Sequence, residues 1–240
     1  MRIDKFLSNS NFGTRKHCKK LVKSGLVTID DVVIKNPDLD FDPSKSSVKV
    51  DSKEVKYFNH VYLMINKPKD YICSVIDERG YESVLNLIDP LYSKRVKLVG
   101  RLDVDTTGLL ILTDDGKLNN RLIHPNHEVE KEYEVTLNHD VPLSLIEEFK
   151  KPIDIGQGEV ASPSVLKDIE GNTCHLVIKE GKYHEIKRMF KRFHLEVVNL
   201  KRVRLAFLTL GDLKIGESRL LSEEEIYKLK ELTNLTEVEE

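Results

Sequence analysis

The segment from Gly100 to Gly116, GRLDVDTTGLLILTDDG, places carboxylates and an arginine beside glycines and an uninterrupted apolar run. The run Leu109–Thr113 predicts a buried strand, and Asp114-Asp115-Gly116 predicts the turn that follows it. Carboxylates beside a buried strand cost free energy unless a partner neutralises them or chemistry uses them. The segment is therefore predicted to form either an ion site or a catalytic site.

The pattern around this segment predicts helices scattered among many short strands. Expected strands cover residues 61–65, 96–99, 109–113, 133–137 and 176–178, and expected helices cover residues 117–123 and 183–193. Such an order favours an α+β fold with a mixed, mostly antiparallel sheet over a doubly wound parallel one.

The N-terminal residues predict a separate small unit, an αα-hairpin followed by strands. Ile3, Phe6 and Leu7 have helical spacing, and Thr14 can cap a second helix that ends at Gly25. Two short strands around Asp30-Asp31 predict a hairpin, and residues 48–55 predict a closing strand. We expect this unit to cover residues 1–57, with a boundary near residues 57–60.

The formal net charge of −2 averages unlike regions of the chain. Residues 1–35 hold eight Lys and Arg against three Asp, and residues 181–204 hold eight against two Glu. Residues 222–240 are acidic, with seven Glu against two Lys. One basic run alone is typical of a solvated helix face. Two runs on either side of a carboxylate segment favour a polyanionic partner such as RNA.

Composition excludes several classes of protein. Hydrophobic residues make up 40% and charged residues 32%, as in ordinary globular proteins. Neither a run of membrane-spanning length nor a signal-peptide core is present, so we expect no membrane partner. The three cysteines, Cys18, Cys73 and Cys174, are far apart. This usage predicts a cytoplasmic protein without a disulfide framework.

A calcium loop is the alternative interpretation of the carboxylate segment. Asp103, Asp105, Thr107, Gly108 and Asp114 fall at EF-hand positions one, three, five, six and twelve. The twelfth position lacks the usual Glu, and the flanks predict strands, so this match is partial. No nucleotide-binding glycine loop is present, and we expect neither a metal nor a cofactor.

Two sets of motifs resemble known families. Arg2–Leu7, Thr14-Arg15 and Leu21–Ile29 resemble the S4 RNA-binding domain. The Gly100–Gly116 segment resembles the signature of pseudouridine synthases of the RsuA type. Matches to three further motifs of that family follow its order, at residues 66–74, 130–133 and 180–190. The resemblance implies an S4-like domain at 1–57, a pseudouridine synthase domain at 60–230 and an acidic tail at 231–240.

Two positions depart from the family pattern. Asp70 replaces a glycine, and Glu185 replaces a common glutamine beside the expected site. An aspartate tolerates a positive φ better than most residues. The glutamate alters the local charge balance.

By resemblance, Asp103 is the catalytic carboxylate, and it acts at C1′ or C2′ of a uridine that has left its stack. Lys187 is the cation expected to keep that carboxylate ionised. Tyr133 is the tyrosine expected to stack on the uracil. Asp105, Asp114 and Asp115 are assigned to loops and turns, and Gly100 and Gly108 to turns that bring the strand end close to RNA.

Basic residues outside this set are expected to bind RNA, chiefly through phosphates. Arg101 is expected to point to the opposite face of a strand from Asp103. The expected RNA-binding residues are Arg2, Lys5, Arg15, Lys16, Lys19, Lys20, Arg101, Lys182 and Arg188.

The resemblance implies isomerisation of uridine in ribosomal RNA, and the small-subunit (16S) enzyme is the nearest match, with the pseudouridine-516 type of activity. The alternatives are a large-subunit (23S) rRNA enzyme of the same family and a non-catalytic RNA-binding or ribosome-assembly factor. We expect a monomer that acts on an assembling small ribosomal subunit.

Overall fold

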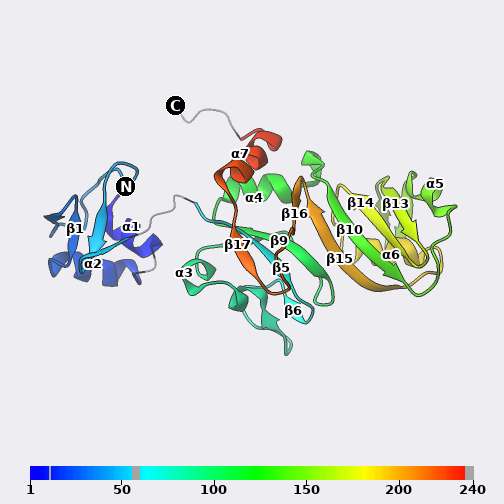
Figure 1. The fold of residues 1–240 in the computed structure, drawn as a ribbon, viewed down its shortest axis with the longest axis horizontal. Coiled ribbons are helices and arrows are strands. Elements are labelled where there is room, and N and C mark those ends of the chain that lie inside the picture. Colours follow the sequence, from blue (N-terminus) through cyan, green and yellow to red (C-terminus); the bar gives the residue numbers. More distant parts are fainter. Residues whose placement is uncertain (11, 56–59, 236–240) are drawn as a thin grey trace. The chain divides into compact units, whose positions relative to one another are not determined.

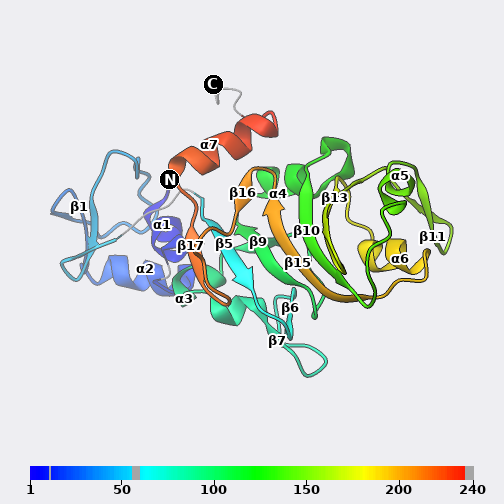
Figure 2. The same cartoon turned by 45° about the vertical axis from the view of Figure 1, so that its right-hand side comes forward.

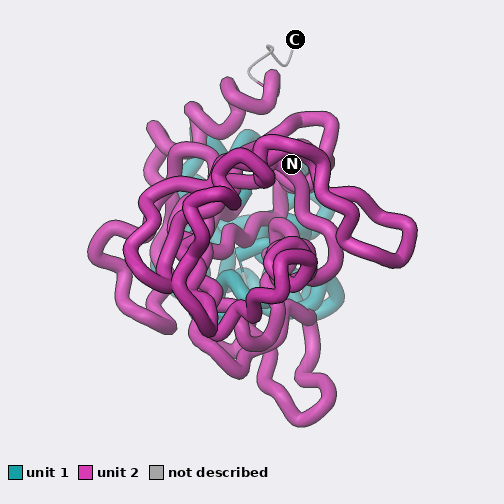
Figure 3. Tube along the Cα trace, turned by 90° about the vertical axis from the view of Figure 1, so that its right-hand side faces the viewer, with its two compact units in different colours: residues 1–60, 89–95 teal, residues 61–88, 96–240 magenta. Residues whose placement is uncertain are grey.

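The computed structural model describes residues 1–10, 12–55 and 60–235. It divides into two compact units (Figure 3). Unit 1 comprises residues 1–60 and 89–95, and unit 2 comprises residues 61–88 and 96–240. Most of the boundary expected near residues 57–60 lies outside the described residues. The domain limits 1–57, 60–230 and 231–240 therefore stay predictions.

Unit 1 contains the expected helix pair and a four-stranded sheet. The helices are α1 (Ile3–Asn9) and α2 (Arg15–Lys23), and the Thr14 hydroxyl caps α2 by accepting the His17 N–H at 3.3 Å. The sheet order is β2-β1-β3-β4, with β1 at Val27–Ile29, β2 at Val32–Val33, β3 at Val48–Val50 and β4 at Lys53–Glu54. The residues predicted to form one closing strand thus form a hairpin. A short helix, α3 (Pro90–Ser93), also belongs to unit 1.

Unit 2 is built on a nine-stranded sheet, and Figure 1 shows its course from β13 to β17. Its strands follow the order β13-β14-β10-β15-β9-β5-β17, with β16 beside β15 and β8 beside β9. All neighbours are antiparallel except β9 and β15. The bounds are β5 Tyr62–Lys67, β8 Lys97–Val99, β9 Thr107–Thr113, β10 Lys131–Leu137, β13 Val165–Glu170, β14 Thr173–Ile178, β15 Val197–Leu205, β16 Leu208–Thr209 and β17 Ser218–Leu220. The expected mixed, mostly antiparallel sheet is confirmed.

Helices cover the sheet of unit 2 (Figure 2). Leu118 of α4 (Gly116–Ile123) and Leu229 of α7 (Glu223–Leu232) share a core with β5 and β9. Phe149 of α5 (Leu145–Phe149) packs on Phe190 of α6 (Glu185–Lys191), with ring centroids 4.9 Å apart. The smaller elements are β6 Tyr71–Ile72, β7 Glu82–Ser83, η1 Val84–Leu87, η2 Pro125–His127, β11 Ile153–Gly156 and β12 Glu159–Ala161. No helix among the described residues is long and apolar enough to cross a bilayer.

The parallel contact between β9 and β15 requires a glycine at position 108. Gly108 has φ +102°, and a Cβ built on it would lie 2.2 Å from the Arg202 carbonyl oxygen. No side chain fits there without moving the backbone of β15. The role expected for Gly108, a turn that approaches RNA, is therefore corrected: this glycine lets two core strands approach each other.

The carboxylates after β9 have the turn roles expected of them. Asp115 caps α4 by accepting the N–H groups of Lys117 and Leu118, each at 3.0 Å, and it accepts the Tyr62 hydroxyl at 2.8 Å. Asp114 accepts the Val61 N–H at 2.8 Å. The intervening residues form strand β9 rather than a loop. This geometry excludes the EF-hand interpretation.

The sheet carries an ion cluster around the buried Glu132 of β10. The Glu132 carboxylate contacts His175 at 2.9 Å, Arg204 at 2.8 Å and Lys167 at 3.0 Å. Burial alone raises the pKa of Glu132, but the hydrogen bonds from these three groups outweigh it and lower the pKa to about 2. Glu132 therefore contributes stability that is present above pH 4.5 and is lost as the pH falls toward 2.

We expect Glu132→Gln to lower the free energy of unfolding by about 3 kcal/mol at pH 7, and by about half as much at pH 3. Urea unfolding at the two pH values measures this difference. Glu134→Gln, on the same strand, is the matched control. Equal losses for Glu132→Gln at both pH values would contradict the assigned pKa.

Candidate active site

The segment between Gly100 and β9 is an irregular loop, and hydrogen bonds from the side chain of Lys67, on β5, hold it in place. The Lys67 side chain is fully buried, and its Nζ donates to the carbonyls of Asp103 at 3.1 Å, Val104 at 3.3 Å and Thr106 at 2.9 Å. Burial lowers the pKa of Lys67. This lysine thus fixes the backbone that presents the Asp103 side chain.

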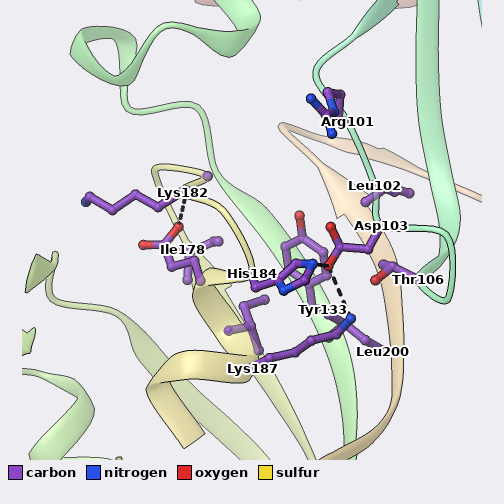
Figure 4. A pocket seen from close by; sticks show the side chains of 13 residues that line it. Arg101, Leu102, Asp103, Thr106, Tyr133, Ile178, Lys182, His184, Lys187 and Leu200 are labelled. Carbon is purple, nitrogen blue, oxygen red and sulfur yellow. Dashed lines mark hydrogen bonds and ion pairs between the residues drawn. The ribbon is translucent and has the colours of Figure 1, made fainter. Parts of the chain in front are cut away.

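Asp103 meets Lys187 of α6 across the site, as Figure 4 shows. The Lys187 ammonium donates to Asp103 Oδ2 at 3.2 Å and to the two oxygens of Asp105 at 2.7 and 2.9 Å. Burial opposes the charge of Lys187, but the bond to Asp105 and the charge of Asp103 outweigh it and raise its pKa. The structure therefore brings the expected pair together.

Asp105 shares this lysine, which sequence reasoning missed. Burial raises the pKa of Asp105, but the hydrogen bond from Lys187 outweighs that effect and lowers it. Asp105 lies in the loop as expected, yet its carboxylate also belongs to the charged centre. One ammonium thus balances two carboxylates.

His184 is a further residue of the centre that sequence reasoning missed. It precedes α6 with a left-handed backbone, φ +50°, and its Nε2 lies 3.5 Å from Asp103 Oδ2. Its ring stacks on Tyr183 with centroids 3.9 Å apart. The sequence signal for it was its place in the family motif matched at residues 180–190, to which no role was assigned.

A pocket of about 70 Å³ opens beside Asp103. Tyr133 of β10, Leu200 of β15 and Thr106 line it together with Asp103 (Figure 4). The Thr106 hydroxyl is buried and has no hydrogen-bond partner among the described residues. The pocket therefore combines an aromatic face, an apolar wall, a carboxylate and a buried hydroxyl.

Arg101 lines the same pocket as Asp103, so the expected opposite face is wrong. Residues two apart in a strand point to the same face, and residues 101–103 form no strand, so neither geometry supports that expectation. Figure 4 shows the guanidinium pointing away from the Asp103 carboxylate. Its expected contact with RNA stays a prediction.

The other basic residues expected to bind RNA differ in how strongly the structure engages them. In unit 2, Arg188 donates to the carbonyls of Ile155 and Gly156 and to Glu159, and Lys182 pairs with Glu180. In unit 1, Arg2, Arg15 and Lys19 surround the buried carboxylate of Asp4, whereas Lys5, Lys16 and Lys20 are exposed. Contact with RNA stays a prediction for all of them.

Glu185, the residue that departs from the family pattern, is buried at the pocket wall. It accepts the Lys182 backbone N–H at 2.8 Å. Burial and a hydrogen bond with Glu180 raise the pKa of Glu185 to about 7. At Glu180, burial also raises the pKa, but the hydrogen bonds from Glu185 and Lys182 outweigh burial and lower the pKa of Glu180 to about 2. Below about pH 7 the pair therefore holds one proton, on Glu185.

Folding therefore takes up a proton at Glu185 between pH 4.5 and 7, and stability falls as the pH rises through that range. We expect the free energy of unfolding of the wild type to fall by about 2–3 kcal/mol relative to Glu185→Gln between pH 5 and pH 8.5. Denaturant unfolding of both proteins across this range measures the difference. A constant difference would show that Glu185 is ionised throughout.

One group of potential metal ligands occurs among the described residues, and it lies outside the pocket. Ligand atoms of Glu132, Asp168 and His175 lie within 4.8 Å of one another. Glu132 is already neutralised by Arg204 and Lys167, so the cluster is accounted for as an ion network.

Comparisons with known proteins agree with this geometry. The family model described as RNA pseudouridylate synthase matches residues 61–192, and the model described as the S4 domain matches residues 1–44. The ribosomal small subunit pseudouridine synthase A of Vibrio cholerae is 39% identical over 229 residues, which cover 94% of this chain and 98% of that protein. The protein of that name from Escherichia coli is 35% identical, with 94% and 98% covered.

Two further matches extend over nearly the whole chain. An uncharacterized RNA pseudouridine synthase of Aquifex aeolicus is 40% identical, with 97% of each chain covered. A crystal structure of a pseudouridylate synthase superposes with a TM-score of 0.68 at 31% identity, covering 95% of this chain and 99% of that one. The chain, an S4 domain followed by a catalytic domain, thus belongs to the RNA pseudouridylate synthases, isomerases that act on RNA.

Proposed function

We propose that this enzyme converts uridine to pseudouridine in small-subunit (16S) ribosomal RNA, with Asp103 as its catalytic carboxylate. The proposal rests on one observation: Lys187 donates a hydrogen bond to Asp103 at a pocket that Tyr133 lines. A carboxylate, its counter-ion and an aromatic face are the groups that a uridine isomerisation requires. The names of the Vibrio cholerae and Escherichia coli relatives support the choice of rRNA.

The reaction breaks the C1′–N1 bond of uridine and forms a C1′–C5 bond, while C5 loses a proton and N1 gains one. Asp103 either adds to C1′ or removes the 2′ proton, and both roles need the ionised carboxylate. Lys187 stabilises that charge at 3.2 Å. Tyr133 packs on the uracil while it turns and assists the transfer of its C5 proton.

The target uridine must leave its stack to reach this pocket, at a cost of a few kcal/mol. Packing of the base on Tyr133 in the pocket offsets part of this cost. Contacts between phosphates and basic side chains offset the remaining cost.

Mapping of pseudouridine tests the proposal. The protein is incubated with unmodified small-subunit and large-subunit rRNA, free and in precursor particles, and the modified nucleotides are located. We expect product in small-subunit rRNA. Product confined to large-subunit rRNA would overturn the choice of substrate, and no product in any of these RNAs would support an assembly factor instead.

In unit 1, Lys16 and Lys20 are exposed one helical turn apart on α2. If they contact phosphates, replacing both by alanine makes the plot of log affinity against log salt concentration shallower, by about 1–2 in the magnitude of its negative slope. Binding of small-subunit rRNA at several salt concentrations measures the slope. The control is Lys53→Ala, an exposed lysine on β4. An unchanged slope in the double variant would remove α2 from the RNA interface.

A further inference from the structure

Tyr183 has an exposure that packing within the protein does not explain. The residue is 67% exposed, yet one face of its ring stacks on His184 with an interplanar angle of 19°. Because His184 lies 3.5 Å from Asp103, the stack extends directly from the catalytic centre. A large aromatic ring stacked at such a place offers its free face to a ligand.

The stack stands between two hollows in unit 2. The first, about 570 Å³, is the hollow of the catalytic centre and is lined by Asp103, Arg79 and Arg101 among others. The second, about 520 Å³, is lined by Lys191, Arg192 and His194 among others. Tyr183 and His184 line both hollows. A polymer that leaves the catalytic hollow can therefore cross Tyr183 and continue over a basic surface.

We propose that the exposed face of Tyr183 is a stacking platform for the unpaired nucleobase next to the target uridine. The phosphates beyond that base then lie over Lys191 and Arg192. This inference rests on the proposed function, because it takes the polymer to be RNA with its uridine at Asp103. Aromatic faces beside cations are the recurring surface for single-stranded RNA.

The chemistry of the two hollows favours RNA over a peptide. Arginine and lysine side chains occur in both hollows. In the first they are balanced by Glu78, Asp103 and Asp105, whereas in the second Arg188, Lys191 and Arg192 outnumber Asp154. An acidic peptide could pair with these charges but has no base to occupy the ring of Tyr183. Stacking on an aromatic ring is tolerant of base identity, so the subsite holds the strand without selecting the sequence.

The test compares Tyr183→Leu, which removes the ring, with Tyr183→Phe, which keeps it. The probe is a short oligocytidylate with one central uridine and a fluorescent 2-aminopurine on its 5′ or 3′ side. We expect quenching of 2-aminopurine on one side with the wild type and with Tyr183→Phe, and none with Tyr183→Leu. We also expect Tyr183→Leu to weaken binding about tenfold, within the range of base–aromatic stacking.

A second variant tests the path beyond the ring. The double variant Lys191→Ala with Arg192→Ala is expected to make the plot of log affinity against log salt concentration shallower, by about 1–2 in the magnitude of its slope. At saturating protein, the quenching of 2-aminopurine is expected to remain. If Tyr183→Leu keeps both the quenching and the affinity of the wild type, the stacking inference is overturned.

The two proposals fail differently. Wild-type protein that modifies rRNA while Tyr183→Leu binds and quenches normally overturns only the platform. Wild-type protein that quenches the probe but modifies no rRNA overturns the proposed function and leaves an RNA-binding platform. A purely structural role for Tyr183 predicts that Tyr183→Leu loses thermal stability but quenches 2-aminopurine as the wild type does. That result would also overturn the proposal that Tyr183 is a stacking platform.

Discussion

Lys67→Met is expected to lower the free energy of unfolding by about 3–5 kcal/mol and to reduce the isomerase rate by at least about 100-fold. The lysine donates from a fully buried position to the carbonyls of Asp103, Val104 and Thr106. Methionine fills a similar volume but leaves these carbonyls without their donor. The loop that presents Asp103 then loses its fixed geometry.

Lys69→Met is the matched control, because Lys69 is exposed two residues further along the chain. Urea unfolding measures stability, and release of the C5 proton as tritium from labelled RNA measures the rate. We expect the control to retain wild-type stability and activity. A stable Lys67→Met protein with full activity would show that the loop holds its conformation without the buried cation.

Local elements of the fold follow from the sequence where a short-range signal exists. The cap of α2 at Thr14 and the turn around Asp115 are of this kind, since each depends on residues within one helical turn. Helix α7 also had such a signal, because Ser222 and Glu225 form a capping box. No helix was predicted there, although Leu229 is buried in the core.

The charged centre depends on contacts that no local pattern encodes. The family resemblance supplied the pairing of Asp103 with Lys187, across 84 positions of sequence. The closer contact of Lys187 with Asp105 was not predicted, because it depends on how the loop turns above Lys67. The expected orientation of Arg101 was wrong because residues two apart in a strand share a face, and because residues 101–103 form no strand.

Asp103→Asn is expected to reduce the isomerase rate by at least about 1,000-fold while RNA affinity stays within about threefold of the wild type. Asparagine has nearly the same shape but provides neither a nucleophile nor a base. The folded structure should persist, because Lys187 keeps its two bonds to Asp105. The loss therefore falls on catalysis rather than on binding or folding.

Asp105→Asn is the matched control, because Asp105 contacts the same ammonium at a shorter distance. If Asp105 serves only to share Lys187, its replacement lowers the rate by about tenfold or less, the scale of one partly exposed charge contact. The contrast between the two variants separates chemistry at Asp103 from the general charge balance of the site.

The most direct test measures pseudouridine formation in small-subunit rRNA by the wild type, Asp103→Asn and Asp105→Asn under identical single-turnover conditions. Asp103 as the catalytic carboxylate predicts complete conversion by the wild type, slower conversion by Asp105→Asn and no detectable product from Asp103→Asn. Product from Asp103→Asn at the wild-type rate would contradict it.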